Sequence, residues 1–107
     1  MKIWVDDVRP APDVTYRHCK SVNDAKLAIQ HFEDLARDFD LAVYDIRLID
    51  IDHDAGEFAF DGGDYIKLLD WLEETGRNYP IRIHSMNPVG VANMRRIIQR
   101  NGWMEVT

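Results

Sequence analysis

The sequence predicts a single α/β domain over residues 1–107, a three-layer sandwich with a central parallel sheet of four or five strands. A chain of 107 residues is the size of one hydrophobic core. Apolar residues make up 46% and charged residues 30%, values typical of a folded globular protein. Short apolar segments alternate with longer amphipathic segments, and this order is typical of parallel strands connected by helices.

The first half of the chain predicts two strands and a helix. Residues 2–5 are an apolar run ending in two aspartates, as in a buried strand. The loop that follows contains two prolines, which lack a backbone N–H and do not lie inside a helix. Residues 14–19 alternate and predict a second, weaker strand. Ser21 then caps a helix, because Asp24 follows three positions later and apolar residues recur at helical spacing up to residue 39.

The second half predicts two more helices among shorter strands. Strand character is expected at residues 44–51, 81–84 and, as an edge strand, 103–106. An amphipathic helix is expected over residues 65–72, with Gly76 after it. Pro88 occupies the favoured first position of a third helix, and Gly102 ends that helix.

Polar side chains follow three of these strands, and in parallel sheets ligands bind beyond the carboxyl ends of the strands. Hard divalent cations bind to several carboxylate oxygens, and clustered acids repel one another without a cation. The sequence therefore predicts a Mg²⁺-type site at this edge, with candidate ligands Asp6, Asp7, Asp52 and Asp54. The alternative is that these acids are solvated or cap the next element.

The junction before the third helix is a candidate phosphate site, because backbone N–H groups and the helix dipole favour anions there. The candidate phosphate-binding residues are Arg9, Ser85, Asn87 and Gly90. His84 is a candidate general acid or base. The alternative is structural: Asn87 caps the helix, Ser85 satisfies a turn and His84 is a core histidine. His18 and His31 are expected to lie away from this edge.

The charge distribution limits the partners. The formal net charge is −6, and residues 77–107 contain five of the 13 basic residues but only one of the 19 acidic residues. An acidic chain argues against broad coating of nucleic acid, which needs many phosphate contacts. No apolar run reaches the ~18 residues of a membrane span. The absence of a secretory signal and the single cysteine, Cys19, predict a cytoplasmic location.

The chain resembles the receiver domain of response regulators in three features. It has acids after the first strand, an aspartate after the middle strand and a hydroxyl residue after the next strand. The resemblance implies that Asp6, Asp7 and Asp52 hold Mg²⁺, that Asp52 accepts a phosphoryl group and that Ser85 replaces the receiver Ser/Thr. It also implies a flavodoxin-like topology, truncated here because the first and last helices are missing. The receiver lysine has no counterpart, since no lysine follows Lys67.

A divergent branch, the cyclic-phosphate processing receiver-like domain, is more similar over nearly the whole chain. The shared motifs are DDVRP at 6–10, DIDHDAG at 50–56, the glycine-led helix with its Trp71-Leu72 pair, and HSMNPVG at 84–90. Asp50 stands where a smaller residue is usual. The resemblance implies binding or hydrolysis of a cyclic phosphate, for example on RNA ends, in conflict and repair systems.

These observations predict a metal-dependent phosphoesterase for a small phosphate-bearing ligand or RNA terminus, with Asp52, His84 and His53 as candidate catalytic residues. In it Mg²⁺ activates a water, and His84 or His53 moves a proton. Two alternatives stay open: a signalling receiver phosphorylated on Asp52, and a module that binds phosphate ligands without catalysis.

Overall fold

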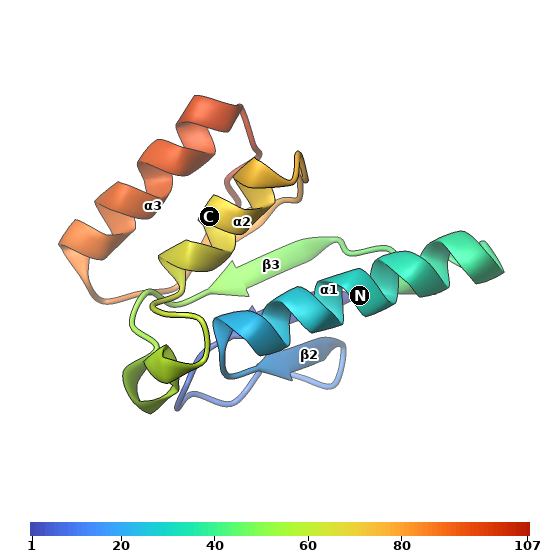
Figure 1. Ribbon diagram of the computed structural model, residues 1–107, viewed down its shortest axis with the longest axis horizontal. Helices are drawn as coiled ribbons and strands as arrows, with labels where there is room; N and C mark the ends of the chain where they lie inside the picture. Colours follow the sequence, from blue (N-terminus) through green and yellow to red (C-terminus); the bar gives the residue numbers. More distant parts are fainter.

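The computed structural model describes all 107 residues and contains four strands and three α-helices (Figure 1). The strands are β1 (Lys2–Val5), β2 (Tyr16–Cys19), β3 (Leu48–Ile51) and β4 (Ile81–Ile83). The helices are α1 (Val22–Phe39), α2 (Ile66–Glu74) and α3 (Pro88–Asn101). Two short 3₁₀ helices, η1 (Ala42–Tyr44) and η2 (Gly56–Phe60), follow α1 and β3 respectively.

The four strands form one parallel sheet in the order β2-β1-β3-β4. Val5 lies opposite both Cys19 and Ile51, and Ile51 lies opposite Ile83. The strands therefore end level with one another, and the residues that follow them share one edge of the sheet. This arrangement confirms the predicted parallel α/β class and its truncated receiver-like topology, in which β1 leads to β2 with no helix between them.

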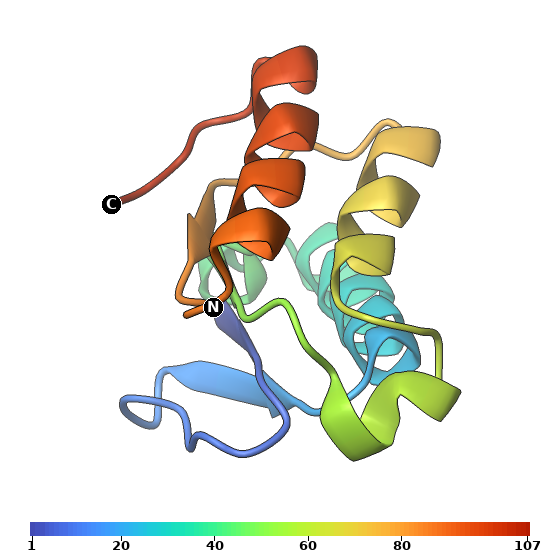
Figure 2. The same cartoon turned by 90° about the vertical axis from the view of Figure 1, so that its left-hand side faces the viewer.

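The hydrophobic core lies on one face of the sheet. Side chains alternate between the faces of a strand, and the core side chains of the strands are Ile3, Val5, Cys19, Ile49, Ile51 and Ile81. The same core contains residues of all three helices, so the helices form a layer on this face (Figure 2). The opposite face carries loops and the side chains of Trp4, Asp50 and Arg82 in place of a helix, so the structure has a sheet and one helical layer where the sequence predicted three layers.

Four predicted strands are shorter in the structure, and the one expected at residues 81–84 ends at Ile83. The segment expected at 44–51 begins with η1, where the Asp45 N–H donates to the Ala42 carbonyl, and β3 starts only at Leu48. The strand expected from residue 14 starts at Tyr16, because Asp13 accepts from the backbone N–H of Thr15 in a turn. Residues 103–106 contact β4 through a single bridge between Glu105 and Ile81.

The helix ends agree with the predicted caps. Ser21 accepts a hydrogen bond from the Asp24 N–H at the start of α1, and Asn87 accepts from the Gly90 N–H at the start of α3. Gly102 adopts a left-handed conformation with φ of 66° and ends α3. None of the helices is both long enough and apolar enough to span a membrane.

Candidate metal and phosphate site

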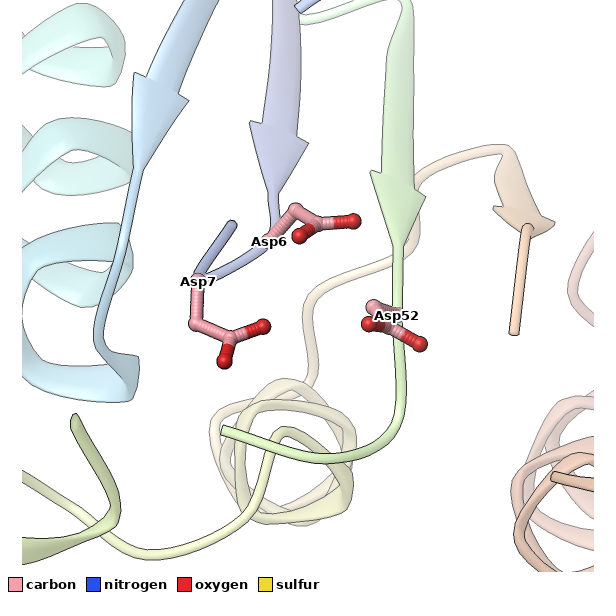
Figure 3. Close-up of side chains that lie close together, drawn as sticks. All are labelled: Asp6, Asp7 and Asp52. Atoms are coloured by element: carbon pink, nitrogen blue, oxygen red, sulfur yellow. The ribbon is translucent and has the colours of Figure 1, made fainter. Parts of the chain in front are cut away.

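Three carboxylates from two neighbouring strands meet at the carboxyl edge of the sheet. Asp6 and Asp7 follow β1, and Asp52 follows β3 (Figure 3). One oxygen from each of the three side chains lies within 4.8 Å of the others. Asp54, the fourth predicted ligand, lies outside this group, and its side chain is 61% exposed.

Asp6 is completely buried, and its orientation is fixed by several donors. Its Oδ1 accepts from the backbone N–H of Val8 at 2.9 Å and of Arg9 at 2.8 Å. Its Oδ2 lies 2.9 Å from Nε2 of His84. Burial alone raises the pKa of Asp6, but the hydrogen bonds from Arg9, Val8 and His84 outweigh burial and hold the pKa below its ordinary value.

Asp7 is held in a narrow space beside Gly56. A Cβ atom added to Gly56 would lie 2.4 Å from Oδ2 of Asp7, closer than any real contact. Gly56 also has a φ of +54°, in the left-handed region that glycine adopts without a steric penalty. Both observations explain why glycine follows the acidic segment 50–54.

The three carboxylates produce a strongly negative local potential. Tyr65 is fully buried nearby and donates from its hydroxyl to the Lys20 carbonyl at 2.7 Å. Its pKa is raised, first by burial and then by the negative charges of Asp7, Asp6 and Asp52. The carboxylates therefore act together on a neighbouring group.

The donor set fits a hard divalent cation. Mg²⁺ prefers carboxylate oxygens together with water, and the group offers three such side chains, of which Asp7 is partly exposed while Asp6 and Asp52 are buried. Receiver domains carry a metal on an acidic cluster of this kind. The structure thus supports a metal-binding capacity at Asp6, Asp7 and Asp52, the first three of the four predicted ligands.

His84 lies inside this site between two carboxylates. Its Nε2 faces Asp6, and its Nδ1 lies 2.6 Å from Oδ1 of Asp50. The ring of Trp4 stacks on the His84 ring, and Arg82 donates to the second oxygen of Asp50 at 3.0 Å. Both ring nitrogens thus face a carboxylate oxygen, which leaves no ring nitrogen of His84 directed at solvent.

His53 is placed differently. Its Nδ1 lies 2.8 Å from Oδ1 of Asp54, and its Nε2 makes no hydrogen bond within the chain. The ring rests against the backbone of α3, since a Cβ on Gly90 would lie 2.4 Å from Cγ of His53. Its backbone N–H donates to Oδ1 of Asp52 at 2.8 Å. Of the two predicted histidines, His53 therefore has the available ring nitrogen.

The predicted phosphate-binding residues surround the same edge. Ser85 accepts from the Asn87 N–H at 3.1 Å, and the Asn87 side chain caps α3 at Gly90. Arg9 donates from Nη1 to the His84 carbonyl at 3.3 Å, and its Nε lies 3.8 Å from Asp6. The loop after β1 and the loop after β4 are thereby joined beside the acidic group.

Sequence reasoning missed four contributors to this edge. Trp4, Asp50 and Arg82 lie opposite one another in the register of β1, β3 and β4. His18, expected elsewhere, places Nε2 2.8 Å from the Asp6 carbonyl, because β2 pairs with β1. The sequence did contain one signal for Asp50. It is the single polar residue in the otherwise apolar strand β3, and because side chains alternate along a strand it points to the face opposite the core.

The pocket of the molecule lies elsewhere. It has a volume of about 410 Å³ and lies beside the residues that precede β3 and β4, including Asp45, Ile46, Asn78 and Pro80. These residues stand at the amino ends of the strands, away from the acidic group. The candidate site is therefore an open edge of the sheet and not an enclosed cavity.

The fold and the site together are those of a receiver-like domain. A cluster of carboxylates lies at the carboxyl edge of a parallel sheet, and a histidine and a helix N-terminus lie beside it. Residues 1–100 match the family of the cyclic-phosphate processing receiver domain, and the chain belongs to this family. Comparison with curated proteins and with solved structures gave no match.

Proposed function

We propose that this protein binds a cyclic phosphate or phosphoester in a Mg²⁺-dependent manner and hydrolyses it. The observation that supports this proposal is the group of Asp6, Asp7 and Asp52 beside a helix N-terminus, Arg9 and a histidine with an available nitrogen. The family is linked by its description to cyclic-phosphate processing. The proposal makes the protein a hydrolase and keeps the cytoplasmic location that the sequence predicts.

The chemistry divides between a cation and the side chains. Asp6, Asp7 and Asp52 would hold Mg²⁺, which would supply a positive charge for a phosphoryl oxygen and lower the pKa of a water. The water oxygen forms a bond to phosphorus, and Nε2 of His53 accepts its proton. One ester bond of the ring breaks, and its leaving oxygen takes up a proton to yield a phosphomonoester. Asp54 beside Nδ1 orients the His53 ring for this role.

The phosphate is held by donors on two loops. The guanidinium of Arg9 reaches the acidic edge from the loop after β1. Ser85, Asn87 and the backbone around Gly90 lie on the segment that starts α3, where N–H groups favour an anion. Before the metal is bound, the carboxylates repel an anionic ligand. The donors on these two loops offset part of that repulsion.

The open edge favours a ligand larger than a free phosphate. Val8 and Met86 are highly exposed and lie on the same two loops as Arg9 and Ser85. Apolar side chains beside a phosphate site offer a surface against which the face of a nucleobase packs. A nucleotide or an RNA terminus with a 2′,3′-cyclic phosphate therefore fits the proposal, which makes RNA processing the expected context.

The direct test offers a 2′,3′-cyclic nucleotide to the protein with Mg²⁺ and follows phosphomonoester formation. We expect turnover that is lost on chelation and in Asp52→Asn, and retained in Asp45→Asn, which removes the same charge at the opposite end of the sheet. Equal rates for the wild type and Asp52→Asn contradict hydrolysis at this site. Calorimetry that shows nucleotide binding without product supports a binding module instead, and acetyl phosphate labelling lost in Asp52→Asn supports a receiver.

A further inference from the structure

We propose that Asp50 is a positioning residue that acts through His84 to orient the Asp6 carboxylate. This inference rests on the proposed function where it concerns metal binding by Asp6. Asp50 is not one of the three clustered carboxylates, and its side chain has no exposure to solvent. Both of its oxygens contact protein side chains, those of His84 and Arg82, so any effect of Asp50 on a ligand passes through its neighbours.

Both oxygens of Asp50 have a partner. Oδ1 lies 2.6 Å from Nδ1 of His84, and Oδ2 accepts from Nη1 of Arg82 at 3.0 Å. A carboxylate buried in an apolar sheet is tolerated only when it is paired and hydrogen-bonded. Arg82 lies opposite Asp50 in the register of β3 and β4, so the backbone itself sets the position of this pair.

The contact with Asp50 determines how the His84 ring is held. One end of the ring faces Asp50, the other end faces Asp6 at 2.9 Å, and Trp4 covers one face of the ring. A rotated ring would place a carbon atom against a carboxylate oxygen at both ends. Asp50 therefore selects the single orientation in which Nε2 reaches Oδ2 of Asp6.

Asp6 depends on this orientation, because its two oxygens have different partners. Backbone N–H groups hold Oδ1, whereas His84 is the close hydrogen-bond partner of Oδ2. Residues behind metal ligands fix the ligand geometry, and their loss typically lowers metal affinity by about 10- to 100-fold. Arg82, Asp50, His84 and Asp6 thus form one continuous chain of contacts from β4 to the end of β1.

The test compares Asp50→Asn and Arg82→Gln with the wild type and with Asp45→Asn as the charge-matched control. Mg²⁺ affinity is measured by calorimetry, and the His84 ring nitrogens are followed by NMR in the metal-free protein. The asparagine amide cannot accept hydrogen bonds from both Arg82 and His84. We expect Asp50→Asn to weaken Mg²⁺ binding about tenfold or more and to shift the ring signals. Arg82→Gln should change the Mg²⁺ affinity and the His84 ring signals in the same direction but by a smaller amount. Asp45→Asn should leave the affinity and the ring signals unchanged.

A second comparison separates positioning from a general structural effect. In a His84→Gln background, the further change Asp50→Asn should leave Mg²⁺ affinity unaltered, because the route to Asp6 is already broken. A folded Asp50→Asn protein with wild-type affinity and ring signals overturns the proposal, and so does an undiminished effect of Asp50→Asn in the His84→Gln background.

Two further outcomes are also decisive. If Asp50→Asn fails to fold, Arg82→Gln decides, and wild-type affinity and ring signals in that variant overturn the proposal. If the wild type binds no Mg²⁺, the proposed function fails by itself. In that case the NMR signals of the His84 ring in Asp50→Asn are the only test of the positioning role of Asp50. Shifted signals support this role, and unshifted signals overturn it.

Discussion

The ring of Trp4 lies flat on the ring of His84, with centroids 3.9 Å apart and planes inclined by only 2°. The indole Nε1 of the same tryptophan donates to the Arg9 carbonyl at 2.9 Å. Trp4 therefore contacts both the histidine and the loop that carries the acidic pair. It lies on the face of the sheet that has no helix, and in part it replaces the missing layer.

Replacing Trp4 should loosen the site as well as the fold. Trp4→Ala is expected to lower the free energy of unfolding by about 3–5 kcal/mol, the range for removal of a buried aromatic side chain. Trp4→Phe keeps a ring against His84 and should cost less, although it loses the hydrogen bond to the Arg9 carbonyl. Urea denaturation measures both values, and equal costs for the two variants would show that stacking contributes nothing.

Gly56 and Gly76 provide a matched pair for the acidic site. Both have positive φ, of +54° and +69°, but only Gly56 has a close neighbour, Oδ2 of Asp7. Gly56→Ala and Gly76→Ala should each cost about 1–2 kcal/mol of stability from backbone strain. Only Gly56→Ala displaces the Asp7 carboxylate, so only this variant should weaken Mg²⁺ binding, which calorimetry measures. A similar loss of affinity in Gly76→Ala would assign the effect to general destabilisation.

Much of the fold follows from local patterns in the sequence. The caps Ser21 and Asn87 and the stop at Gly102 are short-range signals, and the structure confirms each of them. The level ends of the strands follow from parallel pairing, which is why Asp6, Asp7 and Asp52 were expected together and are found together. Element boundaries are less well determined, as the late start of β3 at Leu48 shows.

The parts that the sequence did not reveal depend on contacts between distant residues. Asp50 and Arg82 are 32 positions apart, and no short-range sequence pattern indicates that they form a pair between the neighbouring strands β3 and β4. The same holds for His18, whose approach to the Asp6 carbonyl depends on the pairing of β2 with β1. The orientation of the two histidines also depends on tertiary contacts, so the sequence alone left both as candidates for proton transfer.

The close contact between His53 and Gly90 predicts a change of sign in a double mutant. In the wild type, a Cβ at position 90 would lie 2.4 Å from the ring, so Gly90→Ala should destabilise the protein by about 1–3 kcal/mol. In a His53→Ala background the space is open, and Gly90→Ala should stabilise α3 by up to about 1 kcal/mol because alanine favours helix. Urea denaturation of the four proteins measures this coupling, and two effects of the same sign would contradict the contact.

Glu33 should contribute a pH-dependent part of the stability. Burial raises its pKa, but hydrogen bonds from Arg77 and Tyr79 outweigh burial and hold the pKa below its ordinary value of 4.5. The ionised form therefore stabilises the fold above pH 4.5, and this contribution is lost as the pH falls through the lower pKa of the folded state. Glu33→Gln should cost about 1 kcal/mol at pH 7 and progressively less in acid. Glu74→Gln, on an exposed side chain of α2, is the control and should show no such trend.

Asp52→Asn should change stability in opposite directions with and without a divalent cation. Without the cation, the variant removes one of three mutually repelling carboxylates, so its melting temperature should equal or exceed that of the wild type. With Mg²⁺ at about 100 times its dissociation constant, the wild type should gain about 2.7 kcal/mol, because the cation binds the folded state alone. The variant has lost a ligand and should gain much less. Thermal denaturation of both proteins, with Mg²⁺ and after chelation, measures the crossover, and parallel shifts in both would place the cation away from Asp52.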